Sequence, residues 1–400
     1  MSAVVLPAPA GASGTVTDIV VSQGGYTKND YKVAYVLATD ALTDTTFRVR
    51  QGTTVRHTGT LRDEGFAWGK RVYAADFSSM TAYNGTNFTV TSNGSESYSF
   101  PIQTNIWETY LDEMTSFYRI QRKSIATADA IPTGYSNTAP SAKAYHAAGH
   151  QDDGMSPDGT TFVNLSGGWY DAGDYGQYGG NQWVAGEIAL AYLRHIGDPV
   201  VEFDYDSNGV PDLLDEARWG AEFVIRMVNA FGGPLYRLRT TTDPAFNANA
   251  NGWKHPEDTT DGNPATIGDN RIATHYDVGG AAKGAGMLAA VARAYDAAGL
   301  DAAFFAAATA AAVAAYEYAL GNAHDDSGSY RARGGVANPL LWAEVELYKL
   351  TGDTDYRDAA ADRISLLTFA DIQSTNYWDM RPMAMAEFYP DADAATKAHI

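Results

Sequence analysis

The hydrophobic periodicity of the chain changes near residue 102, and this change restricts the possible folds more than any other feature. Residues 12–102 contain short stretches with alternating or β-branched side chains, separated by turn residues at intervals of about ten residues. Such spacing is typical of a small β-sandwich. The expected strands cover residues 15–22, 31–37, 46–50, 54–61, 72–77, 87–91 and 98–102.

Beyond residue 102 almost every recognisable element has helical spacing. A first helix, with Thr104 as its candidate cap, carries apolar residues from Trp107 to Tyr118 at intervals of three and four. Asp301 and the pair Asn338-Pro339 are predicted to begin two further helices. After the first helix, the predicted helices cover residues 183–196, 211–230, 278–298, 301–320, 339–351, 354–367 and 381–400, so the helices that begin at Asp301 and Asn338-Pro339 are among them.

Two long polar segments, residues 121–182 and 232–277, interrupt this helical pattern. Loops of such length in a compact domain usually line a site or bind an ion. We therefore expect the functional residues to lie in these two segments.

Composition restricts the partners. The chain has 400 residues, of which 45% are hydrophobic, so two globular domains are expected. A net charge of -20 argues against nucleic acid and against an anionic membrane surface, because both require a basic footprint. The absence of cysteine excludes disulfides, thiolate catalysis and zinc sites that need a thiolate.

The segment Gly-Gly-Trp-Tyr-Asp-Ala-Gly-Asp, residues 167–174, is the strongest candidate for chemistry. Asp171 and Asp174 are close enough in sequence to share one water, and the glycines let a ligand approach the backbone. Trp169 and Tyr170 offer flat faces for a sugar ring. Taken alone, these residue types favour an ordinary turn over a carbohydrate site.

Residues 204–215 reproduce the spacing of an EF-type calcium loop, with a glycine at the sixth position. Calcium prefers six to eight oxygen ligands around a sharp turn. The alternative interpretation is a polar turn before a helix whose first turn favours acidic residues. The predicted ligands are Asp204, Asp206, Asn208, the carbonyl of Val210, Asp212 and Asp215.

Two further groups of residues are ambiguous. His146, His150 and the neighbouring Asp152-Asp153 resemble half of a metal site, but a loop with hydrogen-bonded histidines is the better interpretation. Trp253 is either a platform for a saccharide or a packing anchor. Motifs for nucleotide binding and serine hydrolysis are absent from the sequence.

Together these motifs resemble glycoside hydrolase family 9, the inverting endoglucanases, in the subgroup with an N-terminal immunoglobulin-like domain. The resemblance covers nearly the whole chain and is strongest over residues 20–36, 117–122, 167–174, 208–219 and 341–353. It implies an immunoglobulin-like β-sandwich over residues 12–102, followed by an (α/α)6-barrel catalytic domain over residues 103–400. It also implies that Asp174 is the general base and that Asp171 helps to hold the attacking water.

The chain departs from the family pattern in two places. The glutamate that serves as general acid in the family has no counterpart, since Glu387, Asp391 and Asp393 match no part of its motif. With about eight of the twelve helices expected for the barrel, we expect an incomplete barrel whose acid lies beyond Ile400. Lys123 and Gly149 stand about where some relatives carry zinc-binding thiolates, so we expect calcium and no zinc.

The leading hypothesis is therefore endo-acting hydrolysis of β-1,4-glucosidic bonds in cellulose or related β-glucans, with inversion. The alternatives are an exo-acting enzyme, such as a cellobiohydrolase or exo-β-glucosaminidase, and a non-catalytic glycan-binding protein without the general acid. The resemblance further implies a secreted protein, although the sequence begins without an export signal. We expect a monomer with a polysaccharide partner, without nucleic-acid or membrane partners.

Overall fold

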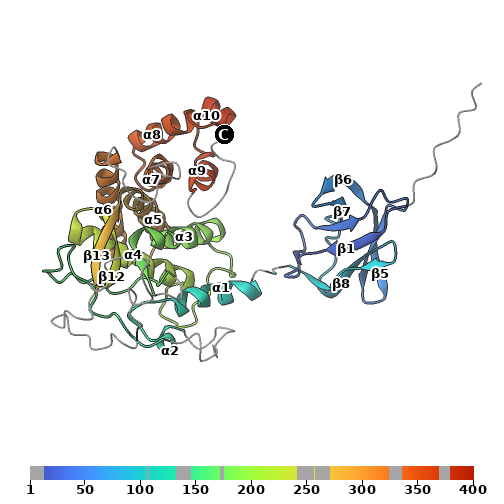
Figure 1. Ribbon diagram of the computed structural model, residues 1–400, viewed down its shortest axis with the longest axis horizontal. Helices are drawn as coiled ribbons and strands as arrows, with labels where there is room; N and C mark the ends of the chain where they lie inside the picture. The colour runs from blue at the N-terminus through green and yellow to red at the C-terminus, as the bar shows by residue number, and fades with distance from the viewer. Residues whose placement is uncertain are drawn as a thin grey trace, which may run out of the picture. The chain divides into compact units, whose positions relative to one another are not determined.

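The computed structural model describes residues 13–104, 106, 108–131, 146–171, 175–240, 256, 271–323, 336–368 and 379–400. The chain divides into two compact units, Met1–Leu111 and Asp112–Ile400. The first unit consists of strands and the second mainly of helices (Figure 1). This order confirms the expected succession of a β-sandwich and a helical domain.

The first unit is a sandwich of two sheets around one core. One sheet has the strand order β1-β3-β7-β6, and the other has the order β2-β10-β8-β4-β5, with β9 paired to β8. Aromatic side chains fill the core, where Phe77 packs against Tyr26 and Phe100 at centroid distances of 5.1 and 5.8 Å. The strands are β1 (Val16–Val20), β2 (Tyr26–Thr27), β3 (Val33–Ala38), β4 (Thr46–Gln51), β5 (Thr54–Thr60), β6 (Arg62–Ala67), β7 (Lys70–Asp76), β8 (Gly85–Ser92), β9 (Ser95–Glu96) and β10 (Phe100–Gln103).

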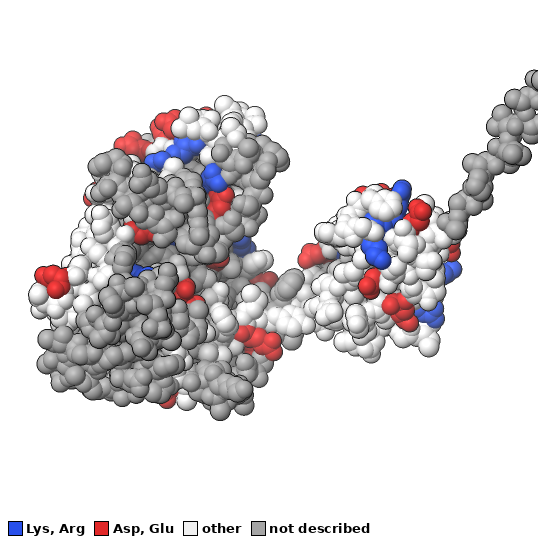
Figure 2. Space-filling model, viewed as in Figure 1, with Lys and Arg blue, Asp and Glu red and all other residues white. Residues whose placement is uncertain are grey.

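Strand β6 was not among the expected strands. Its sequence, Arg-Asp-Glu-Gly-Phe-Ala, lies at an edge and is largely exposed, so no buried face produces an alternating pattern. Its pairing with β7 is antiparallel, through a two-residue turn of Trp68 and Gly69 that both have positive φ. Acidic and basic side chains are interspersed on the face of the sandwich in Figure 2, and two ion pairs, Arg62–Glu64 and Arg71–Asp63, lie on this hairpin.

The second unit is built from helices that alternate between two layers. Helices α3, α5, α7 and α9 pack against one another in succession. Helices α4, α6 and α8 follow the first three of these in sequence and pack against them, whereas α10 packs against α8. Almost every residue of α5 is buried, which places α5 inside the unit. The helices are α1 (Glu108–Ile120), α2 (Thr127–Ala130), the 3-10 helix η1 (Gly179–Trp183), α3 (Val184–His195), α4 (Asp212–Phe231), α5 (Val278–Ala297), α6 (Ala302–Gly321), α7 (Ala337–Thr351), α8 (Thr354–Ser365), α9 (Arg381–Phe388) and α10 (Ala394–His399).

Helix termini agree with the sequence in part. Asp301 caps α6, because its side chain accepts hydrogen bonds from the backbone N–H groups of Ala303 and Phe304. The prediction for Asn338 was wrong: α7 begins before it, and the Asn338 side chain accepts a hydrogen bond from the N–H of Met380 at 2.8 Å. The single helix predicted over residues 381–400 is two helices, α9 and α10, separated by a turn that contains Pro390.

Helix α6 is long and apolar enough to cross a membrane by length and composition. It is rich in alanine and packs against α4, α5 and α7 within the second unit. Small side chains permit this close approach between helices. The buried residues of α6 recur every three or four positions, and the other positions of the helix are partly or fully exposed.

Helix α1 buries the face opposite to the one that its sequence suggests. The apolar residues Met114 and Phe117 are 60% and 57% exposed. Polar residues, among them Thr115 and Arg119, are buried instead. The buried face is polar because α1 meets charged groups of α4, where Arg119 pairs with Asp212 at 2.8 Å.

A three-stranded antiparallel sheet lies within the long polar segments that were expected to be loops. Its order is β11-β12-β13, with β11 (Gln177–Tyr178), β12 (Leu235–Thr240) and β13 (Arg271–Asp277). The alternation that marks a strand is hidden because Arg237 and Arg271 occupy buried positions. Strand β11, which lies six residues after Asp171, pairs with β12 in this sheet. The sheet thereby helps to position the candidate site.

Candidate active site

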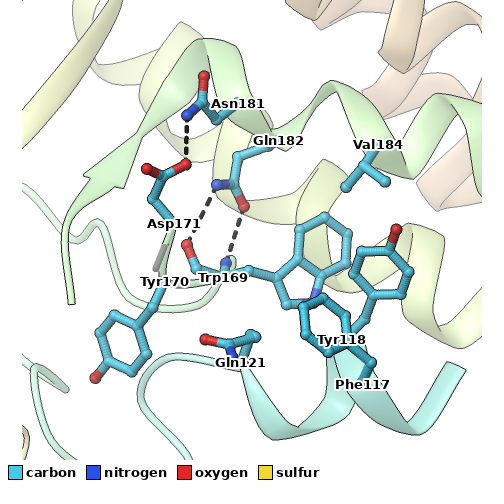
Figure 3. A pocket seen from close by; sticks show the side chains of 9 residues that line it. All are labelled: Phe117, Tyr118, Gln121, Trp169, Tyr170, Asp171, Asn181, Gln182 and Val184. Atoms are coloured by element: carbon cyan, nitrogen blue, oxygen red, sulfur yellow. Dashed lines mark hydrogen bonds between the residues drawn. The ribbon is translucent and has the colours of Figure 1, made fainter. Parts of the chain in front are cut away.

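A cleft in the helical unit contains one of the two predicted catalytic carboxylates. Its wall comes from the end of α1, the segment after Gly168, and the junction of η1 with α3 (Figure 3). Asp171 lies at one end of this wall, beside Asn181. The lining residues are Phe117, Tyr118, Gln121, Trp169, Tyr170, Asp171, Asn181, Gln182 and Val184.

The side chain of Asp171 is exposed and held in a defined direction. Asn181 Nδ2 donates to Asp171 Oδ1 at 2.5 Å, and the Asp171 N–H donates to the carbonyl of Gly176 at 2.7 Å. One carboxylate oxygen is thus oriented by an amide while the group remains open to solvent. Asp174 and Trp253, which were also predicted as site residues, lie outside the described residues.

The backbone before Asp171 is fixed by a buried amide side chain. Gln182 Oε1 accepts from the N–H of Trp169 at 2.9 Å, and Gln182 Nε2 donates to the Trp169 carbonyl at 3.3 Å. Gly168 makes this approach possible: its φ is +70°, and an added Cβ would lie 2.9 Å from Gln182 Oε1. The glycine predicted to permit a close ligand approach therefore permits a close approach of the protein itself.

Trp169 and Tyr170 contribute to the cleft wall, yet both are buried. Trp169 is 4% exposed, and its Nε1 donates to Glu216 Oε1 at 2.6 Å. The ring of Tyr170 meets those of His146 and Tyr175 edge-on, both at 5.2 Å between centroids. Most of each ring faces protein, and the binding of sugar by these two residues stays a prediction.

Glu216 joins three parts of the site. This buried residue of α4 accepts from Arg122 at 2.8 Å, next to its bond with Trp169, while Arg119 Nε lies 3.6 Å away. The Arg122 guanidinium also lies over the ring of Trp219 at 4.6 Å. The end of α1, the Trp169 loop and α4 are consequently connected through a single carboxylate.

A second buried cluster centres on Asp153. Its Oδ2 lies 2.7 Å from Arg271 Nε and 3.1 Å from Lys123 Nζ, and the ring of His150 is 3.6 Å away. Burial lowers the pKa of Lys123 to about 7. Burial opposes ionisation of Asp153, but the charges of Arg271 and Lys123 hold its pKa well below the usual range.

The Asp153 cluster also supports the loop that carries Asp171. Arg271 Nη1 donates to the carbonyl of Tyr175 at 2.7 Å, and Lys123 Nζ donates to the carbonyl of Leu165 at 2.6 Å. Lys123 and His150, considered above in relation to zinc, are thus members of an ion cluster. His146, by contrast, lies within hydrogen-bond distance of two backbone carbonyls, as expected for a loop histidine.

Three of the predicted calcium ligands converge. Carboxylate oxygens of Asp204, Asp206 and Asp212 lie within 4.8 Å of one another. Asn208 and Asp215 are instead hydrogen bonded to each other at 2.7 Å, and Asn208 Oδ1 accepts from the N–H of Val210. The positive φ of Gly209 provides the sharp turn that the pattern requires.

Several residues of the site carry no local signal in the sequence. Asn181 and Gln182 lie ten or more residues after the Trp169-Asp171 segment and act through folding alone. Glu216 and Arg271 also reach the site only through contacts between distant segments. From the sequence, Glu216 was expected in a helix and Arg271 near the end of a loop. The sequence offers one clue: Gln121 and Asn181 are uncharged polar residues beside predicted helix ends, and the helical pattern of apolar residues does not require them there.

The β-sandwich followed by a helical domain agrees with the family models, which define the class of this protein as a glycosyl hydrolase with an accessory β-domain. The model for "Glycosyl hydrolase family 9" matches residues 107–396, and the model for "Cellulase N-terminal ig-like domain" matches residues 15–97. The chain belongs to glycosyl hydrolase family 9, with an immunoglobulin-like domain before the helical one.

Individual relatives agree with this assignment. The chain is 28% identical over 402 residues to Endoglucanase C of Cellulomonas fimi, covering 92% of this chain and 34% of that protein. It is 26% identical over 354 residues to Endoglucanase D of Acetivibrio thermocellus, covering 83% of this chain and 51% of that protein. The chain thus spans between about a third and a half of the length of these curated relatives.

Among solved structures, a metagenome-derived glycoside hydrolase family 9 endoglucanase is similar with a TM-score of 0.68 and 26% identity. The match covers 95% of this chain and 70% of that one. The similarity therefore extends over the β-sandwich and the helical unit. It confirms the predicted fold class, while the number of barrel helices stays a prediction.

Proposed function

We propose that this protein hydrolyses β-1,4-glucosidic bonds within cellulose or related β-glucans, with inversion at the anomeric carbon. The observation that carries the proposal is Asp171, an exposed carboxylate oriented by Asn181 in a cleft of a family 9 domain. The endoglucanases of Cellulomonas fimi and Acetivibrio thermocellus support the substrate class and the endo mode of action.

In this proposal Asp174 removes a proton from the attacking water, and Asp171 holds that water by accepting its second hydrogen. A base of this kind must remain ionised at the working pH, and its neighbour must be fixed in direction. The bond between Asn181 and Asp171 fulfils the second requirement. The general acid should lie roughly 6.5–9.5 Å from the base, which leaves room for the water. We assign no residue to that role.

The decisive experiment compares Asp174→Asn and Asp171→Asn with the parent protein on carboxymethyl cellulose. We expect loss of at least about 100-fold in the release of reducing ends for Asp174→Asn, because general base catalysis typically contributes that much. Asp158→Asn is the matched control, since Asp158 is an exposed loop carboxylate outside the cleft. Full activity of Asp174→Asn would remove the assignment.

The mode of action is tested with the parent enzyme alone. Internal cleavage lowers the viscosity of the polymer early, before much sugar is released, whereas exo-acting cleavage releases sugar at nearly constant viscosity. Inversion predicts that α-anomers form first from β-linked oligosaccharides, which proton NMR detects directly. Early appearance of β-anomers contradicts the proposed water attack.

We further propose that the loop from Asp204 to Asp215 binds calcium as a structural ion. Three converging carboxylates and a turn at Gly209 support a hard cation with oxygen ligands. Asp212 and the Asn208–Asp215 pair lie at the start of α4, so the ion would fix the entry of the chain into this helix. Asp212 also holds Arg119, which links the loop to α1.

Calcium binding is tested by thermal unfolding with and without a chelator. We expect EGTA to lower the melting temperature of the parent and added calcium to restore it, because a ligand of the folded state stabilises that state. Asp206→Ala should remove this response, because it deletes one of the three converging carboxylates. The variant should still fold, since Asp206 is exposed and makes no buried ion pair within the described part of the chain. An unchanged response in that variant contradicts the site.

Because the proposed substrate is a polymer, we infer that the protein acts outside the cell. We also propose that it is a monomer. The acidic net charge of -20 supports a neutral polysaccharide partner over nucleic acid or an anionic membrane. Light scattering coupled to gel filtration tests the monomer, and cell fractionation of the native host tests the location. A dimer in solution would contradict the proposed monomer. Retention of the protein in the cytoplasm would contradict the proposed location.

A further inference from the structure

The 3-10 helix η1 packs on the first turns of α5 through residues that are three apart. An added Cβ on Gly180 would lie 3.1 Å from the Cα of Gly280, so the two backbones are in contact there. Three residues further along both segments, Lys283 Nζ lies 5.1 Å from the centroid of the Trp183 ring. Because a 3-10 helix has three residues per turn, Gly180 and Trp183 share the side of η1 that faces α5.

The two residues between them reach the Asp171 segment instead. Asn181 donates to the Asp171 carboxylate at 2.5 Å, and Gln182 holds the backbone N–H and carbonyl of Trp169 (Figure 3). Helix η1 has only five residues, and the hydrogen bonds of a 3-10 helix have poor geometry. The position of η1 therefore depends on its packing against α5.

Lys283 is a costly residue for this place in the core. Its exposed fraction is 0%, and the α5 residues around it are mainly alanine and glycine. Burial of an amine is unfavourable unless polar or charged groups compensate for it. Among the described residues, the charges that act on it are Asp277, at the end of β13, and Glu187 of α3. Both favour the ammonium ion, but burial outweighs them and lowers the pKa of Lys283 to about 7.

We propose that Lys283 is a positioning residue for the Asp171 carboxylate. Its ammonium group attracts the face of the Trp183 indole, and such a cation–π contact is stronger where water is excluded. The indole fixes η1 on α5, and Asn181 passes that position to Asp171. At high pH the amine is neutral, this attraction is lost, and Asp171 is held less firmly. The role rests on the proposed function, in which Asp171 holds the attacking water.

The contact with Trp183 is tested by fluorescence of the full chain on both sides of pH 7. The spectrum of the parent minus that of Trp183→Phe isolates this indole from the other tryptophans. We expect the difference spectrum to change with a midpoint near pH 7, because an adjacent ammonium group alters the emission of an indole. The same subtraction in the Lys283→Met background should give a spectrum that is constant over this range. An equal pH dependence in both backgrounds overturns the proposal.

The effect on the reaction is tested by the release of reducing ends from carboxymethyl cellulose. Lys283→Met should lower kcat about fivefold and leave KM nearly unchanged, because a misplaced Asp171 affects the water and not the binding of glucan. Lys283→Arg, whose guanidinium stays charged, should recover most of kcat. The ratio of kcat in the parent to kcat in Lys283→Arg should fall as the pH rises through about 7, since only the parent loses its charge.

Glu344→Gln is the matched control for a loss of stability. Glu344 is a buried carboxylate of α7, and its partners Arg363 and Tyr316 lie on α8 and α6. The variant should unfold at a lower temperature than the parent, with unchanged kcat.

The outcomes separate the positioning role from the proposed activity. A loss of kcat in Glu344→Gln equal to that in Lys283→Met, or a kcat ratio that is constant with pH, overturns the positioning role and leaves the Asp174 test unaffected. If the parent hydrolyses no glucan, the proposed function fails, while the fluorescence titration still decides whether Lys283 holds Trp183.

Discussion

Trp169 and Glu216, which lie 47 residues apart in the chain, share a buried hydrogen bond of 2.6 Å. Glu216 simultaneously accepts from Arg122, so the indole, the guanidinium and the carboxylate form one unit. The unit connects α4 to the loop that ends in Asp171, because Trp169 is only two residues away. Stability of the fold and geometry of the cleft therefore depend on the same carboxylate.

Replacing Glu216 with alanine should destabilise the protein by about 3–5 kcal/mol, because it leaves a buried arginine without its counter-charge. Glu216→Gln keeps the shape and one acceptor, so its loss should be smaller. Urea unfolding followed by circular dichroism measures both. Equal stability of Glu216→Ala and the parent would contradict the role of this residue. In Glu216→Gln we expect a lower rate of reducing-end release even where the free energy of unfolding is nearly unchanged, because the hydrogen bond that holds Trp169 is weaker.

Asp153 neutralises two buried cations, Lys123 and Arg271, and its replacement gives the second prediction. Asp153→Asn should cost about 3–5 kcal/mol of unfolding free energy, since both cations lose their partner. The double variant Asp153→Asn with Lys123→Met should recover part of that loss, because one of the uncompensated charges is removed. Chemical denaturation of the four proteins of this cycle provides the coupling energy. Strict additivity would show that the two residues do not interact.

Lys283 gives a prediction about pH. This lysine of α5 is buried over the ring of Trp183, with its Nζ 5.1 Å from the ring centroid. Burial lowers its pKa from 10.5 to about 7, although Asp277 and Glu187 act in the opposite direction. Between these two pH values the unfolded chain binds more protons than the folded one. The contribution of Lys283 to stability therefore rises as the pH increases from about 7 to about 10.

The measurement compares Lys283→Met with the parent by urea unfolding at several pH values from 7 to 10. The stability of the parent relative to the variant should increase across this range, because folding must remove the proton that the unfolded lysine holds up to its ordinary pKa of 10.5, and this cost falls as the pH rises. Lys397→Met is the control, since Lys397 makes an exposed contact on α10. A difference between parent and Lys283→Met that is constant with pH would refute the prediction.

Features that depend on neighbours in sequence could be predicted without the structure. The strands around the sandwich core, the Asp301 cap and the pattern of residues 204–215 all follow from spacing of side chains along one segment. The segment of residues 167–174 stands out in the sequence because its aromatic, glycine and acidic residues are consecutive, and the catalytic roles of Asp171 and Asp174 stay predictions.

The remainder depends on contacts between distant segments. Asp153 and Arg271 lie 118 residues apart, and each alone would be expected at the surface as a charged residue. The same pairing hides β13, because a strand with a buried arginine lacks the usual alternation. On α1 the charged residues of α4 reverse the buried face, so the apolar stripe that predicts a core helix is partly exposed instead. No local pattern encodes these pairings.

The last prediction concerns the space that Trp169 occupies against α4. An added Cβ on Gly220 would lie 2.2 Å from Cζ3 of Trp169, too close for any real contact. In an exposed helix interior, exchange of glycine for alanine normally stabilises by about 1 kcal/mol. Gly220→Ala should instead destabilise by about 1–3 kcal/mol and lower activity, because the indole must move and the Asp171 segment moves with it.

Gly321→Ala is the matched control, since Gly321 ends α6 and an added Cβ there meets no atom within 4 Å. We expect this variant to be as stable as the parent or slightly more stable, with unchanged activity. Thermal unfolding and the rate of reducing-end release measure both effects on the same samples. If Gly220→Ala were as stable and active as Gly321→Ala, Trp169 would not be confined by α4, and the link between this helix and the Asp171 segment would have to be abandoned.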